Sequence, residues 1–181
     1  MFSFLRKSSP TQRSIEAIYG MIVAQARQPV FYTAFGVLDT VSGRFDMVLL
    51  HLWMVLRLLR QNPAGEEPAQ KLFDRFCADM DDNLREMGVG DLTVPKRMRK
   101  FGEAFYGRSA AYDAAISAGP AELGAALNRN IFNEADVVNA DRLAAYVVET
   151  LGQLAEIDQD AAFVRGEWEF PAVAAPRRDN R

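Results

Sequence analysis

Residues 45–61 constrain the fold of this chain more than any other segment. Projected at about 100° per residue, they predict a helix that is apolar on almost every side, with Asp46, Arg57 and Arg60 confined to one narrow strip. Asn62-Pro63 marks the end of this helix. Such a helix must be covered on most sides, so either the rest of the chain or a bound partner has to enclose it.

Amphipathic helices are predicted on both sides of this segment. Ser9-Pro10-Thr11-Gln12 has the pattern of a capping box, and the helix that starts there is expected to end before Pro29. After a polar hinge at residues 64–68, another helix should run to Gly88, which suits a left-handed C-terminal cap. The apolar faces are Ile15, Ile18, Tyr19, Ile22, Val23 and Ala26 in the first helix, and Leu72, Phe73, Phe76, Cys77, Met80, Leu84 and Met87 in the other.

Residues 28–44 combine proline, glycine and aromatic side chains. This composition predicts a short helical turn followed by an ordered loop, which Phe31, Tyr32 and Phe35 should attach to the core. Thr40 and Ser42 are alternative caps for the helix that follows.

The second half of the chain also has helical periodicity. Pro95 opens a helix that Gly107 is expected to close. Its apolar face is Met98, Phe101 and Phe105, whereas Lys96, Arg99, Lys100 and Glu103 point outward. Two short helices are predicted over residues 110–118 and 120–131, and a longer one over residues 139–157.

These patterns predict an all-α fold with about six to seven helices, because strand-like alternation is nearly absent. Residues 9–170 should form a single compact domain, and residues 1–8 a flexible N-terminus. Residues 171–181 are rich in proline, alanine and arginine without an apolar period, so we expect a disordered C-terminal tail there.

Charge and cysteine content narrow the functional classes. A net charge of −3 argues against a general nucleic-acid binder, so no DNA partner is expected. Cys77 is the only cysteine and no secretory signal is evident, which favours a reducing compartment. The longest apolar stretch, residues 47–59, is shorter than the ~20 residues of a membrane-spanning helix. We therefore expect a cytoplasmic protein, with peripheral contact to the cytoplasmic face of the inner membrane left open.

No constellation for catalysis or metal binding emerges from the sequence. His51, the only histidine, lies within the apolar helix and is best interpreted as a core or interface residue. Residues 79–83 start like a calcium loop, but Leu84 replaces the required glycine and Gly90 the required glutamate. Cys77 lies on an apolar stripe, where a thiol behaves as a small hydrophobe. We therefore assign no catalytic, metal-binding or cofactor-binding residue.

Two features suggest a binding surface instead. Asp79 and Asp81 flank the apolar stripe of their helix and Asn83 lies just within it, so polar groups border a hydrophobic surface. Residues 96–100 form a compact basic patch in an otherwise acidic protein. For each feature, the alternative is an ordinary helix face that contacts solvent and no partner.

At these residues the sequence resembles the ubiquinol-cytochrome c chaperone family, and it looks like a bacterial member. The resemblance runs from about Tyr19 to the predicted helix that contains Tyr146, with both chain ends outside it. It is carried by Gly43-Arg44-Phe45-Asp46, Leu72-Phe73-Asp74, Asp79-Met80-Asp81, Arg85-Glu86-Met87-Gly88-Val89-Gly90-Asp91, Val94-Pro95-Lys96 and Phe105-Tyr106-Gly107-Arg108.

The resemblance implies a non-catalytic, all-helical assembly chaperone without a cofactor. Its client would be newly made cytochrome b, during biogenesis of the ubiquinol-cytochrome c reductase complex. A ribosome or a small assembly partner, as used by mitochondrial relatives, stays open for this chain. The partner-binding residues expected on this basis are Arg44, Phe45, Asp46, Asp79, Asp81, Asn83, Lys96, Arg99, Lys100 and Arg108.

A second hypothesis belongs to another functional class. The chain would then be a small helical enzyme or carrier of lipid or quinone metabolism, and its apolar surface would be a ligand pocket. His51, or the pair Asp79 and Asp81, would act as the base.

Overall fold

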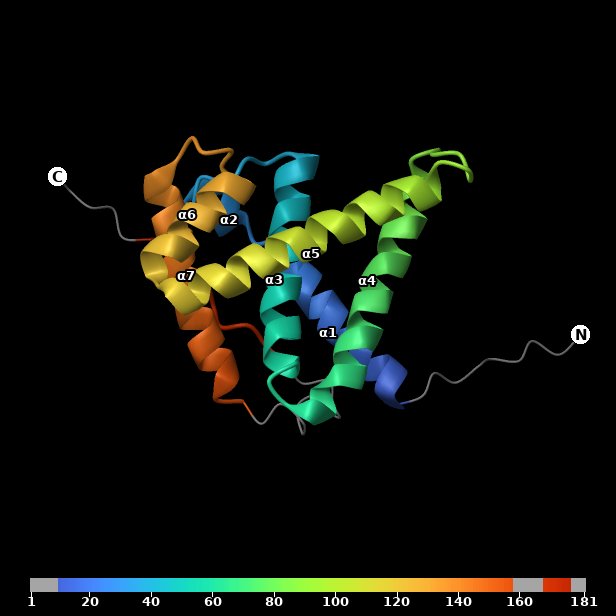
Figure 1. Ribbon diagram of the computed structural model, residues 1–181, viewed down its shortest axis with the longest axis horizontal. Coiled ribbons are helices and arrows are strands. Elements are labelled where there is room, and N and C mark those ends of the chain that lie inside the picture. Colours follow the sequence, from blue (N-terminus) through green and yellow to red (C-terminus); the bar gives the residue numbers. More distant parts are fainter. Residues whose placement is uncertain (1–9, 158–167, 177–181) are drawn as a thin grey trace, which may run out of the picture.

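The computed structural model describes residues 10–157 and 168–176, and the regular structure of these residues is entirely helical (Figure 1). The all-α prediction is confirmed. Ser9, the proposed cap of the first helix, and residues 1–8 lie outside the described residues. The elements are α1 (Pro10–Ala26), α2 (Pro29–Thr33), α3 (Val41–Leu59), a 3-10 turn (Pro63–Gly65), α4 (Glu66–Glu86), α5 (Val94–Ala118), α6 (Pro120–Ile131) and α7 (Val137–Ala155).

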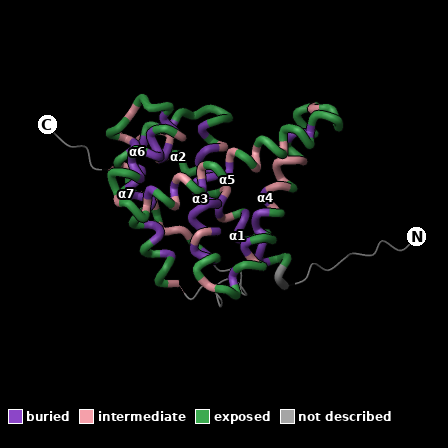
Figure 2. The backbone as a smooth tube through the Cα atoms, viewed as in Figure 1, coloured by how far each residue is buried: buried purple, intermediate pink, exposed green. Residues whose placement is uncertain are grey.

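Helix α3 is the centre of the fold. It packs against α1, α4, α6 and α7, and it is buried along most of its length (Figures 1 and 2). The chain itself therefore supplies the cover that this apolar helix requires. Thr40 is its cap, because the Thr40 side chain accepts a hydrogen bond from the backbone N–H of Gly43 at 3.1 Å. The helix starts at Val41, directly after Thr40, which is one of the two predicted caps.

The aromatic loop around α2 is fixed to the core as predicted. Phe31 and Phe35 are buried, and the Tyr32 hydroxyl donates to the carbonyl of Ala26 at 2.7 Å. Phe31 lies among the rings of Phe35, His51 and Tyr146, with centroid distances between 5.1 and 5.5 Å. These contacts join α2 to α3 and α7.

The expected end of a helix at Gly107 is wrong. Helix α5 runs without a break from Val94 to Ala118, so the fourth predicted helix and the next short one are a single element. Its buried side chains continue past the glycine, with Phe105 before it and Tyr112 after it. The packing of these residues outweighs the cost of about 1 kcal/mol that a glycine adds to a helix interior. The helix ends instead at Gly119, whose φ of 143° is accessible mainly to glycine.

Replacing Gly107 with alanine should therefore raise the free energy of unfolding, by roughly 0.5–1 kcal/mol. The position is exposed, and a Cβ atom built there meets no atom within 4 Å. Chemical denaturation of the two proteins measures the difference. A destabilised Gly107→Ala variant would show that the helix needs glycine at this point.

Residues 168–176 form no helix or strand but pack against the bundle. Trp168 is buried, and the Phe170 ring lies 5.2 Å from the ring of His51. The Gln25 side chain donates to the Pro171 carbonyl at 3.3 Å, and Val173 is partly buried. Trp168 and Phe170 belong to the predicted domain, and within the predicted tail Pro171 and Val173 contact that domain. Residues 177–181 lie outside the described residues.

Candidate functional site

The C-terminal part of α4 and the N-terminal part of α5, with the connecting residues 87–93, form an arm that extends away from the other helices (Figure 1). Gly88 ends α4 with a φ of 76°, as predicted from the sequence. The N–H of Val89 donates to the carbonyl of Leu84 at 3.0 Å, and that of Gly88 to the carbonyl of Arg85 at 2.9 Å. This pair of hydrogen bonds is a Schellman motif, which fixes the direction of the chain at the tip.

The tip of the arm exposes two large apolar side chains. Met87 is 70% exposed and Leu92 is 97% exposed. The prediction that Met87 belongs to the apolar stripe of α4 is wrong, because Met87 follows the last helical residue and leaves the register of the buried face. Below the tip, Arg85 pairs with Asp81 at 2.6 Å and also with Asp91. A solvent-exposed apolar pair on a well-defined turn is suited to contact with an apolar partner.

Aromatic rings join the base of the arm to α3. Phe45 of α3 contacts Phe101 of α5 at 5.1 Å and Phe76 of α4 at 6.4 Å between ring centroids. Phe73 adds a contact with Phe105 at 5.0 Å. Phe45 is therefore mainly a packing residue, although it is not fully buried. The arm is anchored where it crosses α3.

An ion pair stabilises the same junction. Arg108 of α5 lies 2.9 Å from a carboxylate oxygen of Asp46 on α3, and both side chains are largely buried. Burial raises the pKa of the Asp46 carboxyl to about 6, while the charge of Arg108 opposes this shift. The structure thus brings together two residues predicted to bind a partner, and it directs them toward each other.

The polar residues of α4 have partners within the fold. The Tyr19 hydroxyl donates to Asp79 at 2.8 Å, and Arg75 lies 3.7 Å from the same carboxylate. Asn83 donates to the backbone carbonyl of Asp79 at 2.6 Å. Asp81 is half-buried in its pair with Arg85. These groups do not converge on one site, and Asp79 joins α4 to α1.

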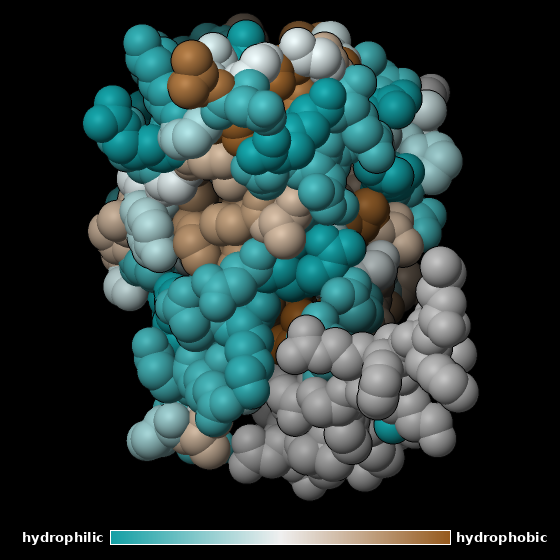
Figure 3. Space-filling model, turned by 90° about the vertical axis from the view of Figure 1, so that its right-hand side faces the viewer, coloured by the Kyte–Doolittle hydropathy of each residue, from teal (hydrophilic) through white to brown (hydrophobic). Residues whose placement is uncertain are grey.

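The basic residues in the first turns of α5 face solvent. Lys96, Arg99 and Lys100 are all exposed, and the ion pair of Arg99 with Glu103 is long at 3.6 Å. Arg44 lies on α3 and forms an exposed pair with Asp39 at 2.6 Å. Figure 3 shows that the side of the molecule where the arm ends is mostly hydrophilic, with a band of apolar groups between hydrophilic ones. Lys96, Arg99 and Lys100, termed the basic strip below, present their positive charges to solvent.

His51 is a structural residue of the core. Its Nδ1 atom lies 2.7 Å from the Met47 carbonyl, which can only accept, so Nδ1 carries the hydrogen. Nε2 therefore accepts from the Tyr146 hydroxyl at 2.9 Å. Burial lowers the pKa of His51 to about 4, and the ring has no exposed surface. A ring that a substrate cannot reach does not serve as a catalytic base, so the interpretation as a core histidine is confirmed.

Cys77 is half-buried on α4. Burial raises the pKa of the Cys77 thiol, which keeps it protonated as predicted. Over residues 10–157 and 168–176 there is no cluster of three or more histidine, cysteine or acidic residues able to hold a metal ion. Nor does any helix in these ranges combine the length and apolar composition needed to cross a bilayer.

Sequence reasoning missed two features. The exposure of Leu92 has only a weak signal in the sequence, which is its place in a short segment between Gly90 and Pro95. The polar group around Tyr146, which binds His51 and Gln25, joins residues far apart in the sequence. Local sequence patterns do not predict such a group.

The fold and its exposed arm define a helical binding protein. The sequence model of the family described as "Ubiquinol-cytochrome C chaperone" matches residues 33–170. The chain therefore belongs to this family of assembly chaperones, which are not enzymes, and the resemblance seen in the sequence is confirmed.

Known proteins support this assignment. The crystal structure of the Cbp3 homolog from Brucella abortus matches with a TM-score of 0.81 and 41% identity, covering 93% of this chain and 94% of the other. The ubiquinol-cytochrome-c reductase complex assembly factor 1 of Xenopus laevis is 27% identical over 83% of this chain and 76% of its own length. The mouse and human proteins of that name are 28% identical, and the matched region covers 45% and 44% of their lengths.

Proposed function

We propose that this chain is an assembly chaperone of the ubiquinol-cytochrome c reductase complex, and that its client is newly made cytochrome b. Membership of the chaperone family supports the role in assembly. The observation that supports the arm as the client-binding surface is the exposure of Met87 and Leu92 at its tip. The arm presents these side chains away from the core, so a client can cover them without unfolding the chaperone.

The chemistry of the arm suits a client rich in apolar helices. Such a client exposes apolar surface before it is assembled, and covering that surface is favourable by about 25 cal/mol per Å². Met87 and Leu92 would supply the apolar contact. The basic strip on α5 would meet acidic segments of the client, which speeds association and fixes orientation more than it adds affinity.

The junction of the arm with α3 would act indirectly. Asp46 and Arg108 hold α5 against α3, and Phe45 stacks between α4 and α5. Under this proposal, the basic strip from the predicted site contacts the client together with the tip of the arm. Phe45, Asp46 and Arg108, which were also predicted to bind a partner, instead hold the arm in place.

The test is capture of cytochrome b by the tagged, full-length chain in its native host, measured by mass spectrometry. Reversing Lys96, Arg99 and Lys100 to glutamate should leave the melting temperature nearly unchanged, because exposed substitutions usually alter stability by less than about 0.5 kcal/mol each. Recovery of cytochrome b should fall, most strongly when the capture is done at low salt. The double variant Met87→Ser and Leu92→Ser should lower recovery at every salt concentration.

A matched control reverses three exposed arginines elsewhere: Arg13 on α1, Arg27 directly after α1, and Arg129 on α6. This control has the same change in net charge and should retain the client. Normal recovery by the arm variants would exclude the arm as the client surface. In another outcome, the charge-reversed variant recovers cytochrome b normally but loses ribosomal proteins or binding to anionic vesicles. That result would assign the basic strip to one of those partners.

A further inference from the structure

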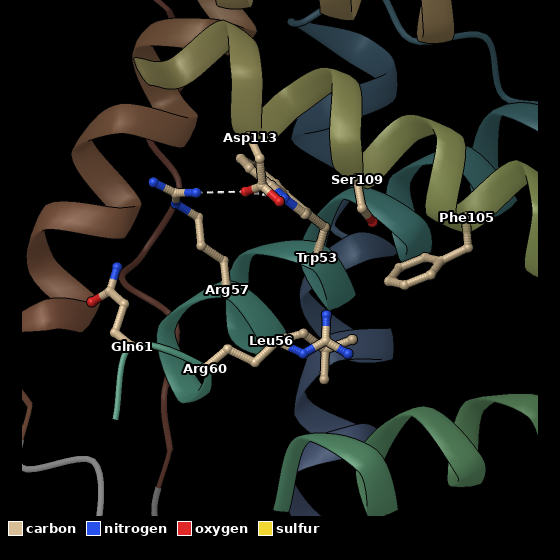
Figure 4. A pocket seen from close by; sticks show the side chains of 8 residues that line it. All are labelled: Trp53, Leu56, Arg57, Arg60, Gln61, Phe105, Ser109 and Asp113. Atoms are coloured by element: carbon tan, nitrogen blue, oxygen red, sulfur yellow. Dashed lines mark hydrogen bonds and ion pairs between the residues drawn. The ribbon is translucent and has the colours of Figure 1, made fainter. Parts of the chain in front are cut away.

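A pocket of about 260 Å³ lies between the C-terminal end of α3 and the middle of α5, apart from the tip of the arm (Figure 4). Its walls combine apolar and polar side chains. Trp53, Leu56 and Phe105 are buried and form the apolar part, while Arg57, Arg60 and Ser109 contribute polar groups. The pocket is smaller than the roughly 300–1,000 Å³ of sites for drug-sized ligands, so it suits a small molecule.

The hydroxyl of Ser109 carries the argument for a ligand. Ser109 is 9% exposed, and its Oγ atom has no hydrogen-bond partner among the described residues. Figure 4 shows this hydroxyl directed from α5 into the pocket. Buried hydroxyls are nearly always hydrogen-bonded, and a serine within a helix commonly bonds to the carbonyl four residues before it. An unsatisfied hydroxyl that faces a cavity points to a group that enters the cavity.

The charges of the pocket define that group. Arg57 is paired with Asp113 at 2.5 Å, and the Trp53 indole donates to the same carboxylate at 3.1 Å. Arg60 is exposed, and no carboxylate of the described residues lies within ion-pair distance of it. Two arginines and one aspartate leave a net charge of +1 in the pocket walls. A singly charged anion balances this charge, whereas a doubly charged anion would leave an uncompensated negative charge in the pocket.

We propose that this pocket binds a small monoanion that has a short apolar chain, such as a carboxylate of about the length of hexanoate. The anionic oxygens accept from the guanidinium of Arg60 and the hydroxyl of Ser109, and the chain lies against Phe105 and Leu56. The monoanionic phosphodiester of a lipid headgroup has the same charge and is the second source of such chemistry. This inference does not depend on the proposed client.

The probe is hexanoate, titrated into the full chain and followed by calorimetry and by the amide resonances of Phe105 and Ser109. A dissociation constant of about 1 mM is the expected scale for so small a ligand. Hexanol, which lacks the charge, should bind at least tenfold more weakly. A soluble short-chain phosphatidylglycerol replaces hexanoate in a parallel titration, and tighter binding of that probe would identify the lipid headgroup as the source.

Arg60→Gln and Ser109→Ala should each weaken hexanoate binding about tenfold or more, since each removes a charge-assisted hydrogen bond. Matched controls are Arg129→Gln, on α6, and Ser117→Ala, whose hydroxyl donates to the Asp113 carbonyl at 2.9 Å. Both controls should bind as the unaltered chain does. Melting temperatures identify any variant that fails to fold. The proposal is overturned if neither anion binds, or if binding is unchanged in Arg60→Gln and Ser109→Ala.

Discussion

Replacing Phe31 with alanine is expected to lower the free energy of unfolding by roughly 3–5 kcal/mol. The ring has no exposed surface and lies at the meeting point of α2, α3 and α7. Its removal takes away apolar contacts and leaves a cavity that the helices cannot fully close. Chemical denaturation of the variant beside the unaltered chain measures the loss.

Phe101→Ala is the matched control for this prediction. Phe101 is also an aromatic residue in a helix, but it is only half-buried and its ring contact is with Phe45 at 5.1 Å. The same truncation should therefore cost clearly less than at Phe31. Equal losses at the two positions would contradict this dependence of the loss on burial.

Acidification from pH 7 to pH 5 should destabilise the protein through His51, by about 2 kcal/mol. The folded chain holds this ring neutral, with a pKa of about 4, whereas in the unfolded chain the ring has the ordinary histidine pKa of 6.5. The stability contributed by this group is fully present above pH 6.5, is lost progressively as the pH falls below 6.5, and is gone once the pH has fallen through 4. His51→Gln keeps a neutral polar side chain, so its stability should decline less over the same range.

Asp46 should act in the opposite direction. Its pKa is raised from 3.8 to about 6 in the folded state, so protonation below pH 6 favours the folded chain, by roughly 1 kcal/mol at pH 5. The variant Asp46→Asn should lose this gain and decline more steeply with acid than the unaltered chain. Unfolding curves at a series of pH values for the three proteins separate the two groups. Parallel curves for His51→Gln and the unaltered chain would contradict the assigned role of His51.

These predictions rest on features that the sequence revealed to different degrees. Apolar periodicity predicted α1, α4 and α7, and the aromatic side chains predicted an ordered loop around α2. The position of His51 within an apolar helix predicted a core residue, but its partner Tyr146 comes from a distant helix. Hydrogen bonds between such distant residues are decided by packing, which no local pattern encodes.

For some predicted partner-binding residues, local sequence pattern was enough to place the side chain, whereas for others only the tertiary structure does so. Lys96, Arg99 and Lys100 were expected to point outward and do so, because helical periodicity alone determines the face they occupy. Asp46 and Arg108 were expected at a partner surface, yet they pair with each other. Sequence shows that a residue is charged, whereas only the crossing of α3 and α5 shows that an opposite charge lies 2.9 Å away.

The sequence by itself determined the helical class, the need to bury α3 and the family, since each follows from residue pattern along the chain. The tertiary structure decided the rest. It continued α5 through Gly107, because Phe105 and Tyr112 on either side of the glycine are buried by other helices. It exposed Met87 and Leu92 and left the Ser109 hydroxyl facing a pocket, because exposure depends on which elements pack above a residue.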